Sequence, residues 1–279
     1  MKNNYNLYIP QKINDVVLIV HGMEETQERY KDFSLFLKDN NCIVLTYNLI
    51  GHEENNRGYF GIDGKNKLVK QLENYVNFLY DKYNIKVTII GHSMGSLIVR
   101  NYLQLNSQKI NKIILLGTPP PRIFTNLAKF IAKIITKFKN DNEYSLLLEK
   151  LTFLNTYKFP DLSWISLNEE NVNFYKNSPD CGFKFTINGY ITLYQLVIDL
   201  NKTFLNQNKN IPISIFVGSD DPIVGGQYGL KKTINNLKKQ GFNNINIKIY
   251  NKLRHELLNE LNKKEIYDDI LKRIKEHNG

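Results

Sequence analysis

The stretch Val87-Thr88-Ile89-Ile90-Gly91-His92-Ser93-Met94-Gly95 decides the fold that we predict for this chain. Its first four residues form an apolar, β-branched run, which is typical of a buried strand, and the apolar residues that follow it have helical spacing. A serine in the pattern Gly-x-Ser-x-Gly between a strand and a helix is characteristic of a nucleophile elbow. We therefore predict that Ser93 is a nucleophile held on a tight turn.

Steric crowding explains why both ends of this motif are glycine. The turn is so tight that side chains two residues before and two residues after Ser93 would collide, and Gly91 and Gly95 have none. The helix that follows points its N-terminus towards any negative charge that develops at the serine. Because the pentapeptide also occurs by chance in many loops, the rest of the chain must supply a base, an acid and an oxyanion hole.

Strands and helices alternate along most of the chain. Apolar, β-branched runs predict strands at residues 16–20, 43–47, 87–90, 113–116, 213–217 and 245–250. Helical periodicity predicts helices at residues 26–40, 65–83, 93–105, 227–240 and 258–275. Continuous apolar strands that alternate with helices predict an α/β fold, a mostly parallel sheet with helices on both faces.

The alternation stops between Thr118 and Phe185, and the three prolines 119–121 end the strand that precedes this segment. We predict that residues 118–186 form a cap inserted over the C-terminal edge of the sheet, where open α/β sheets bind their ligands. The core is then split into residues 1–117 and 187–279.

Five histidines compete for the role of base: His21, His52, His92, His255 and His277. We favour His255, because it follows the last predicted strand across a short turn and precedes the final helix. His92, within the elbow, is expected to point away from its neighbouring serine.

The acid should lie between the serine and the histidine in the sequence. Asp220 and Asp221 directly follow the strand at residues 213–217. Either aspartate could orient the imidazole, and we favour Asp221 because Pro222 fixes an extended turn after it. Two backbone amides should form the oxyanion hole, those of Met94 and Met23, with Gly22 allowing a close approach.

Composition limits the function classes. The chain has 279 residues, 42% of them hydrophobic, which suits one α/β domain with an insertion or two small domains. The net charge of +10 accompanies a general excess of Lys and Asn, without a basic cluster interleaved with aromatic residues, so we expect no nucleic acid as a partner. Cys42 and Cys181 form no CxxC pattern, and we found neither a signal-peptide core nor a membrane-spanning run, so we expect a cytoplasmic protein.

The chain resembles the monoacylglycerol lipase and lysophospholipase group of α/β-hydrolases, which is also called serine aminopeptidase-like. The matching motifs are His21–Glu25 with Arg29 and Tyr30, Gly91–Ser96, Gly218–Asp221 and Arg254–Glu260, with weaker similarity at Trp164–Ser166 and Asp180–Phe183. This resemblance implies an eight-stranded sheet with a small cap and no cofactor or metal. It also implies a Ser93–Asp221–His255 triad with Met23 and Met94 as oxyanion donors. We expect the substrate to contact His21, Gly22, His92 and Trp164.

One loop departs from the family pattern. Where the family usually has Asp-x-Arg-Gly-His-Gly, this chain has Asn48-Leu49-Ile50-Gly51-His52-Glu53. Because the predicted triad lies elsewhere, the departure puts the substrate in doubt more than the chemistry.

A candidate lid helix follows the three prolines. Within Arg122–Asn140, three lysines recur every four residues, and apolar residues cover the other side (Ile123, Leu127, Phe130, Ile131, Ile134 and Phe138). Two interpretations remain open: the apolar face packs on the pocket, or the basic amphipathic helix contacts an anionic membrane.

From these observations we predict a serine hydrolase that cleaves esters of single-chain lipids, lysophospholipids or monoacylglycerols, through an acyl-enzyme. A short-chain carboxylesterase, a thioesterase and an aminopeptidase-like hydrolase are alternatives. An aminopeptidase would need cap carboxylates for the amine, for which Glu169 and Glu170 are available. A hydrolase-fold lipid-binding protein without turnover is a further alternative.

Overall fold

A seven-stranded sheet runs through the part of the chain that the structure, a computed structural model, describes: residues 5–202 and 208–276. The strands are β1 (Tyr5–Tyr8), β2 (Asp15–Val20), β3 (Cys42–Tyr47), β4 (Val87–His92), β5 (Ile110–Leu116), β6 (Ile213–Gly218) and β7 (Ile245–Tyr250). Their order is β1-β3-β2-β4-β5-β6-β7, with β1 antiparallel to β3 and every other pair parallel. The prediction of a mostly parallel sheet is confirmed. His277 and residues 1–4 lie outside the described residues.

All six predicted strands are present, and β1 is the strand that the sequence did not reveal. Its sequence, Tyr-Asn-Leu-Tyr, is half-buried along its whole length, because it pairs with β3 at one edge of the sheet. A short edge strand of this kind has no apolar run that would distinguish it from a loop. The described residues thus contain seven strands, one fewer than the resemblance implied.

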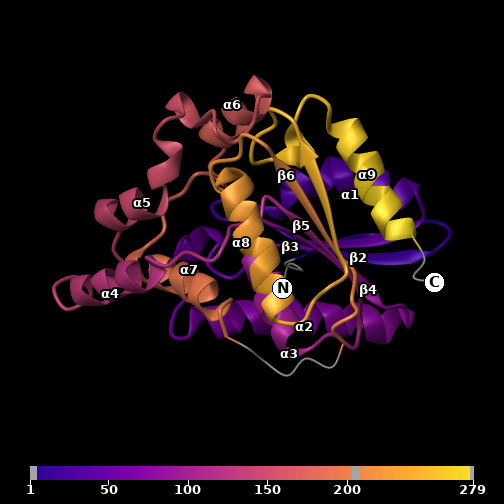
Figure 1. Ribbon diagram of the computed structural model, residues 1–279, viewed down its shortest axis with the longest axis horizontal. Coiled ribbons are helices and arrows are strands. Elements are labelled where there is room, and N and C mark those ends of the chain that lie inside the picture. Colours follow the sequence, from indigo (N-terminus) through magenta and orange to yellow (C-terminus); the bar gives the residue numbers. More distant parts are fainter. Residues whose placement is uncertain (1–4, 203–207, 277–279) are drawn as a thin grey trace.

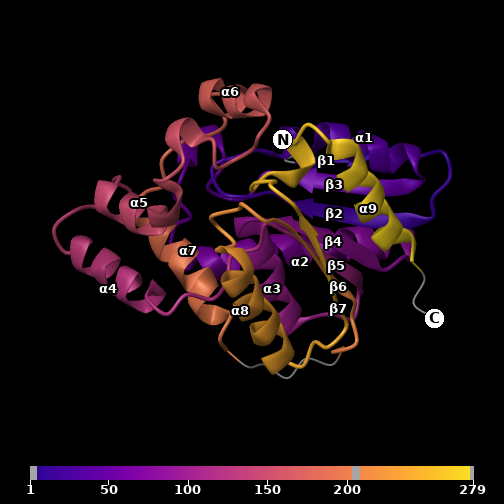
Figure 2. The same ribbon diagram turned by 45° about the horizontal axis from the view of Figure 1, so that its top comes forward.

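Helices cover both faces of this sheet. The helices α1 (Lys31–Asp39) and α9 (Lys263–Lys275) lie on one face, and α2 (Gly64–Tyr83), α3 (Met94–Leu105) and α8 (Gly226–Lys239) lie on the other, as Figure 2 shows. Each face has its own apolar core, since alternate residues of a strand point to opposite sides of a sheet. Val17, Ile19 and Val44 pack on the side of α1 and α9, whereas Val16, Leu18 and Leu45 pack on the side of α2 and α3.

The described part of the segment between β5 and β6 contains four α-helices: α4 (Thr125–Ile135), α5 (Leu146–Thr152), α6 (Glu169–Asn177) and α7 (Ile187–Asp199). The helices α4 and α5 lie side by side at one side of the molecule, and α6 lies apart from them at the top of the view (Figure 1). The helix α7 packs against α4 and also against α2 and α3, and it therefore connects this segment to the core. Thr186 is the N-cap of α7, and its hydroxyl accepts a hydrogen bond from the Gly189 amide.

Candidate active site

Ser93 is the single residue between the end of β4 and the start of α3. Its backbone has φ +50° and ψ −118°, a left-handed conformation that a non-glycine residue adopts only under strain. A Cβ atom on Gly91 would lie 2.9 Å from the Cα of Ser96, and one on Gly95 would lie 2.2 Å from the carbonyl oxygen of Val20. Both glycines are therefore required by the main chain around the turn.

His255 and Asp221 meet at the carboxyl ends of the last two strands. His255 Nδ1 lies 2.8 Å from Asp221 Oδ2, and both side chains are buried. The other carboxylate oxygen of Asp221 accepts hydrogen bonds from the amides of Ile223 (2.8 Å) and Val224 (3.3 Å). Asp220, the alternative acid, is exposed and accepts a hydrogen bond from the Ser219 hydroxyl. The structure thus brings Asp221 to the imidazole and leaves Nε2 as the ring nitrogen available to a nucleophile.

The main chain of β5 connects the serine to the histidine. The amide of Ser93 donates to the carbonyl oxygen of Leu116 (3.0 Å). The next residue, Gly117, has φ +52°, and a Cβ atom there would lie 2.9 Å from His255 Nδ1. The imidazole thus packs directly on the strand end to which Ser93 is bonded.

A cavity of about 710 Å³ lies between these strand ends and the cap. That volume is within the range of about 300–1,000 Å³ that small-molecule sites occupy. Its lining includes the predicted triad members Ser93 and His255, the predicted oxyanion donors Met23 and Met94, and two residues expected to contact substrate, His92 and Trp164. From the cap it also includes side chains such as Leu127, Ile131, Leu151, Phe153 and Leu154. The cavity is therefore mostly apolar, with the candidate nucleophile and base in its wall.

His21 and Gly22 lie behind this wall instead of in it. The amide of Leu49 donates to His21 Nε2 (2.9 Å), so that nitrogen carries no proton, and His21 Nδ1 donates to the Gly22 carbonyl oxygen (2.8 Å). A Cβ atom on Gly22 would lie 3.1 Å from the Cβ of Ser93, so this loop passes directly beside the elbow. Both residues shape the loop before Met23, and neither is among the described residues that line the cavity.

The loop Asn48–Glu53, which departs from the family pattern, contacts the loop that contains Met23. Asn48 Oδ1 accepts a hydrogen bond from the Gln27 amide (2.9 Å), and His52 Nε2 accepts one from the Glu24 amide (3.3 Å). The His52 ring also packs edge-on against His21. The altered residue Asn48 and the unchanged His52 thus support the segment of residues 21–27, the Met23 loop, which contains a predicted oxyanion donor.

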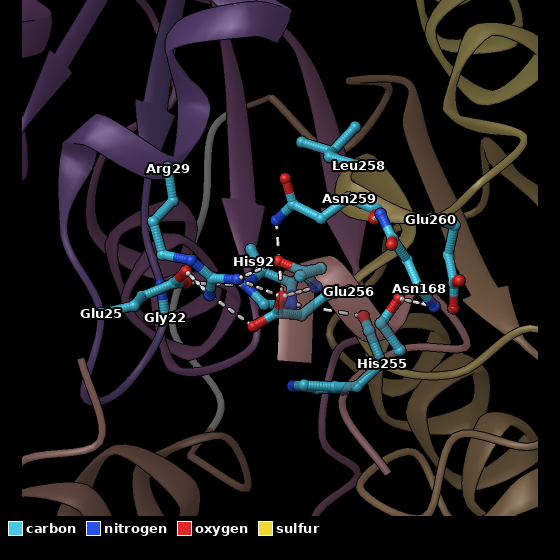
Figure 3. Close-up of polar contacts among 12 residues, drawn as sticks. Gly22, Glu25, Arg29, His92, Asn168, His255, Glu256, Leu258, Asn259 and Glu260 are labelled. Atoms are coloured by element: carbon cyan, nitrogen blue, oxygen red, sulfur yellow. Dashed lines mark hydrogen bonds and ion pairs between the residues drawn. The ribbon is translucent and has the colours of Figure 1, made fainter. Parts of the chain in front are cut away.

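A buried charged cluster joins the Met23 loop to the loop that carries His255 (Figure 3). Arg29 donates to Glu25 (3.0 Å) and forms two bonds of 2.5 Å with the Glu256 carboxylate. A third partner is Asn171 of α6, whose Oδ1 accepts from Arg29 (2.7 Å). Four donors meet at the Glu25 carboxylate: the Gly22 amide, the Tyr30 hydroxyl, the His92 ring and Arg29.

The predicted site did not include this cluster. The family motifs contain Glu25, Arg29 and Glu256, but 227 residues separate Arg29 from Glu256, and nothing in the sequence pairs them. Burial opposes ionisation of Glu25, yet His92 and Arg29 hold the pKa of this carboxyl well below its ordinary value. Burial likewise opposes a charged Arg29, and Glu256 and Glu25 outweigh it and raise the pKa of the guanidinium.

The cap is bonded to the His255 loop at several points beyond this cluster. The Glu256 amide donates to the carbonyl oxygen of Ile165 (2.8 Å), and the Asn168 side chain donates to the carbonyl oxygen of Asn259 (3.0 Å). The Glu260 carboxylate accepts from the Leu167 amide (3.0 Å). Figure 3 shows Asn168, Asn259 and Glu260 side by side. These bonds fix one end of the cap relative to the base.

The described residues contain no group of His, Cys, Asp or Glu side chains arranged to hold a metal ion. In the same part of the chain, no helix is both long and apolar enough to span a bilayer. Cys42 and Cys181 are both free and buried, as expected for Cys42 in its apolar strand.

The seven-stranded sheet, the strained serine between β4 and α3, and the histidine–aspartate pair at the strand ends define an α/β-hydrolase. A family profile described as serine aminopeptidase, S33 (Hydrolase_4) matches residues 11–262. The chain belongs to this family of hydrolases.

Solved structures agree with the fold. A carboxyl esterase from Bacillus coagulans, in complex with glycerol, has a TM-score of 0.86 and 24% identity over 97% of this chain and 92% of its own. A monoacylglycerol lipase from Paleococcus ferrophilus has a TM-score of 0.75 and 17% identity over 98% of each chain. A monoglyceride lipase from Saccharomyces cerevisiae has a TM-score of 0.76 and 20% identity, over 99% of this chain and 92% of its own. Among curated proteins, no sequence matches this chain significantly.

Proposed function

We propose that this hydrolase cleaves carboxylic esters of single-chain lipids through an acyl-enzyme on Ser93. The observation that carries this proposal is the cavity of about 710 Å³, which has Ser93 and His255 in one wall and apolar cap residues in the others. A cavity of this size and lining suits an acyl chain whose ester carbonyl lies at the serine. Relatives of the same fold described as esterases and monoacylglycerol lipases support the same reaction class.

The proposed reaction is the usual one for a serine, histidine and aspartate of this arrangement. Ser93 Oγ attacks the ester carbonyl carbon while His255 Nε2 takes its proton, and Asp221 holds the imidazole through Nδ1. The amides of Met23 and Met94 stabilise the oxyanion. His255 then returns the proton to the leaving alcohol, and a water molecule activated by the same histidine releases the fatty acid and restores Ser93.

Two basic side chains favour a lysophospholipid among the single-chain lipids. Arg122 and Lys232 both line the cavity. The one hydrogen bond that the structure describes for the Arg122 side chain runs to the Ile223 carbonyl oxygen (3.2 Å), and its guanidinium has donors to spare. A guanidinium and an ammonium at the cavity wall suit a phosphate-bearing head group. A neutral monoacylglycerol would occupy the same acyl site but would form no ion pair with Arg122 or Lys232.

An aminopeptidase-like activity has less support. Glu169 and Glu170, the cap carboxylates considered for an amine, are exposed at the start of α6. Of the carboxyl groups in the cavity wall, Glu25 and Glu256 are paired with Arg29. Burial raises the pKa of the third, Glu24, to about 8, so it is mostly neutral at pH 7. Among the described lining residues we therefore see no lone carboxylate for an ammonium group.

The decisive experiment measures hydrolysis of esters that share one acyl chain and differ in the alcohol: methyl, glycerol, glycerophosphate and glycerophosphocholine. The chain length is then varied from C4 to C18, with Ser93→Ala as the blank. We expect the rate to rise with chain length, the glycerophosphate esters to be favoured, and Ser93→Ala to lose at least about a thousandfold. A preference for C4 would indicate a short-chain esterase. A fluorophosphonate that fails to label Ser93 would indicate a binding protein without turnover.

We further propose that the segment Arg122–Asn140 contacts an anionic lipid surface. Of its six predicted apolar residues, Ile131 packs against the core, whereas the others are exposed, including Leu127 at 56%, Phe130 at 61% and Phe138 at 83%. Lys133 and Lys137 are exposed on the same segment. An exposed apolar stripe beside lysines is typical of helices that lie in a membrane interface. A cytoplasmic enzyme with this helix at its cavity mouth could take a lipid directly from the membrane.

A further inference from the structure

The imidazole of His92 lies between two hydrogen-bond acceptors. Its Nδ1 is 2.9 Å from Glu25 Oε1, and its Nε2 is 3.3 Å from the carbonyl oxygen of His255 (Figure 3). A backbone carbonyl oxygen can only accept, so Nε2 needs a proton to bond with it. If Glu25 is ionised, Nδ1 needs a proton as well.

The surroundings of Glu25 require its ionised form. Its Oε1 accepts hydrogen bonds from the Gly22 amide and the Tyr30 hydroxyl (2.8 Å), in addition to the contact with His92. Its Oε2 accepts from Arg29. A carboxylate can accept all of these bonds, whereas a protonated carboxyl group would have to donate one. Both nitrogens of His92 therefore face groups that act only as acceptors.

The charge balance of the cluster leads to the same conclusion. Glu25 and Glu256 are two carboxylates, and Arg29 is one guanidinium, with side chains that are at most 5% exposed. Without a second cation, one negative charge would be buried uncompensated, which is costly. His92, whose side chain is 7% exposed, is the group in contact with Glu25 that can supply that cation.

Two other buried histidines of the same region have a different pattern. His21 Nε2 accepts a hydrogen bond from the Leu49 amide, and His52 Nε2 accepts one from the Glu24 amide, so each ring has one unprotonated nitrogen. Burial lowers the pKa of both rings. The region thus holds two neutral imidazoles beside His92, all similarly buried.

We propose that His92 is held as an imidazolium and that it places a fixed positive charge in the cavity wall beside Ser93. This inference rests on the proposed function, because the charge would act on the oxyanion that forms when Ser93 attacks an ester. A cation fixed before the reaction stabilises developing negative charge without any reorganisation. Through Nε2, His92 also holds the main chain of His255, so it acts as a positioning residue for the base.

The groups that face His92 come from three parts of the chain. From the loop after β2 and the turn that follows come Glu25, Arg29 and Tyr30, and from the loop after β7 come His255 and Glu256. His21 is a further neighbour. Burial alone would lower the pKa of His92, but the attraction of Glu25, with a smaller contribution from Glu256, raises it above the ordinary value of 6.5. This direction agrees with the geometry, in which both ring nitrogens of His92 face acceptors.

The direct test is a ¹H–¹⁵N spectrum of the full chain with labelled histidine, recorded at pH 7.5, with signals assigned through His92→Asn, His21→Gln and His52→Gln. We expect both ring nitrogens of His92 to be protonated, whereas His21 and His52 each show one unprotonated nitrogen in the same spectrum. An unprotonated nitrogen on His92 at this pH would overturn the proposal. Because the spectrum needs no substrate, its outcome does not depend on which ester the protein cleaves.

The kinetic test compares His92→Asn with His92→Lys on the best substrate. His92→Asn, which removes the charge, should lower kcat by about 10- to 100-fold and change KM less than threefold. The kcat of His92→Lys, which keeps a positive charge, should be at least about fivefold higher than that of His92→Asn. Equal activity of the two variants would contradict a role for the charge. Wild-type protein that cleaves no ester would defeat the proposed function, whereas the spectrum would still decide the charge state of His92.

Discussion

The Arg29 guanidinium forms two hydrogen bonds of 2.5 Å with the Glu256 carboxylate, 227 residues further along the chain. Arg29 also binds Glu25, three residues after Gly22 in the Met23 loop, and Glu256 directly follows the candidate base His255. One buried side chain therefore links the Met23 loop to the loop that carries His255. The bond from Arg29 to Asn171 extends this connection to the cap.

Replacing Arg29 by methionine should destabilise the protein by about 3–5 kcal/mol, because two buried carboxylates would lose their shared partner. Urea unfolding followed by circular dichroism measures this change in the free energy of unfolding. The matched control is Lys70→Met, which breaks the exposed Lys70–Glu73 pair and should cost less than about 0.5 kcal/mol. Equal effects of the two substitutions would show that the buried cluster is not a main source of stability.

The contribution of Glu25 to stability should depend on pH in a defined direction. The pKa of Glu25 lies below its ordinary value of 4.5 in the folded state, so folding favours the ionised form. The stabilisation is then fully present above pH 4.5 and is lost as the pH falls through the lower, folded-state pKa. Above pH 5.5 the titration of His92, whose pKa Glu25 raises, also contributes to the difference in unfolding free energy between wild type and Glu25→Gln. Below pH 5.5 we expect this difference to shrink towards pH 3. A difference that grows between pH 5.5 and pH 3 would contradict this assignment.

Asp221→Asn should lower kcat/KM by about a thousandfold or more, because an amide cannot hold the imidazole in the required tautomer or stabilise its charged form. Asp220→Asn, the neighbouring exposed residue, is the control and should change kcat/KM less than about threefold. Both variants should unfold near the wild-type temperature if the effect is chemical. If Asp220→Asn were the damaging change, the acid would have been assigned to the wrong aspartate.

Gly95→Ala should prevent folding or cost more than about 3 kcal/mol, because its Cβ would lie 2.2 Å from a main-chain oxygen of β2 that cannot move freely. The control is Gly226→Ala at the start of α8. Gly226 has φ +62°, but no described atom lies within 4 Å of the added Cβ, so only backbone strain of about 1 kcal/mol is expected. Soluble yield and thermal unfolding distinguish the two, and a Gly95→Ala protein as stable as the control would refute the steric argument.

Reversing two charges on the cap should weaken binding to anionic vesicles. We expect Lys133→Glu/Lys137→Glu to lower the affinity for phosphatidylserine-containing vesicles at least tenfold in a flotation assay, at about 1 kcal/mol per charge near the surface. The control, Lys31→Glu/Lys264→Glu, makes the same charge change on α1 and α9, on the far face of the sheet. Similar losses in both double variants would mean that net charge, and not this helix, drives binding.

Local pattern was sufficient for the framework of the protein. Apolar β-branched runs and helical spacing located six of the seven described strands and the helices α1, α2, α3, α8 and α9, because a strand buried on both faces has to be apolar throughout. The sequence did not predict α7, which is buried over most of its length. The sequence also predicted the tight turn around Ser93, since only glycine fits where the backbones approach so closely. Chain order predicted that Asp221 and His255 lie close together, because each follows a strand and parallel strands end at one edge, and the structure brings the two side chains into contact. The edge strand β1 lacked such a pattern.

Only the tertiary structure shows which charged side chains lie together in the interior and which apolar helix faces are exposed to solvent. The sequence contains Glu25, Arg29, His92 and Glu256 at ordinary positions, and only folding brings them into one buried cluster. The same holds for the apolar stripe of α4, whose periodicity fits a packed or an exposed helix equally well. A sequence pattern indicates the preference of one helix or strand, whereas burial and charge balance depend on neighbouring residues, such as Arg29 and Glu256, which are 227 residues apart. The sequence by itself therefore determined the sheet, the elbow and the order of the candidate triad. The cavity, the protonation of its histidines and the exposed cap surface were decided by the fold.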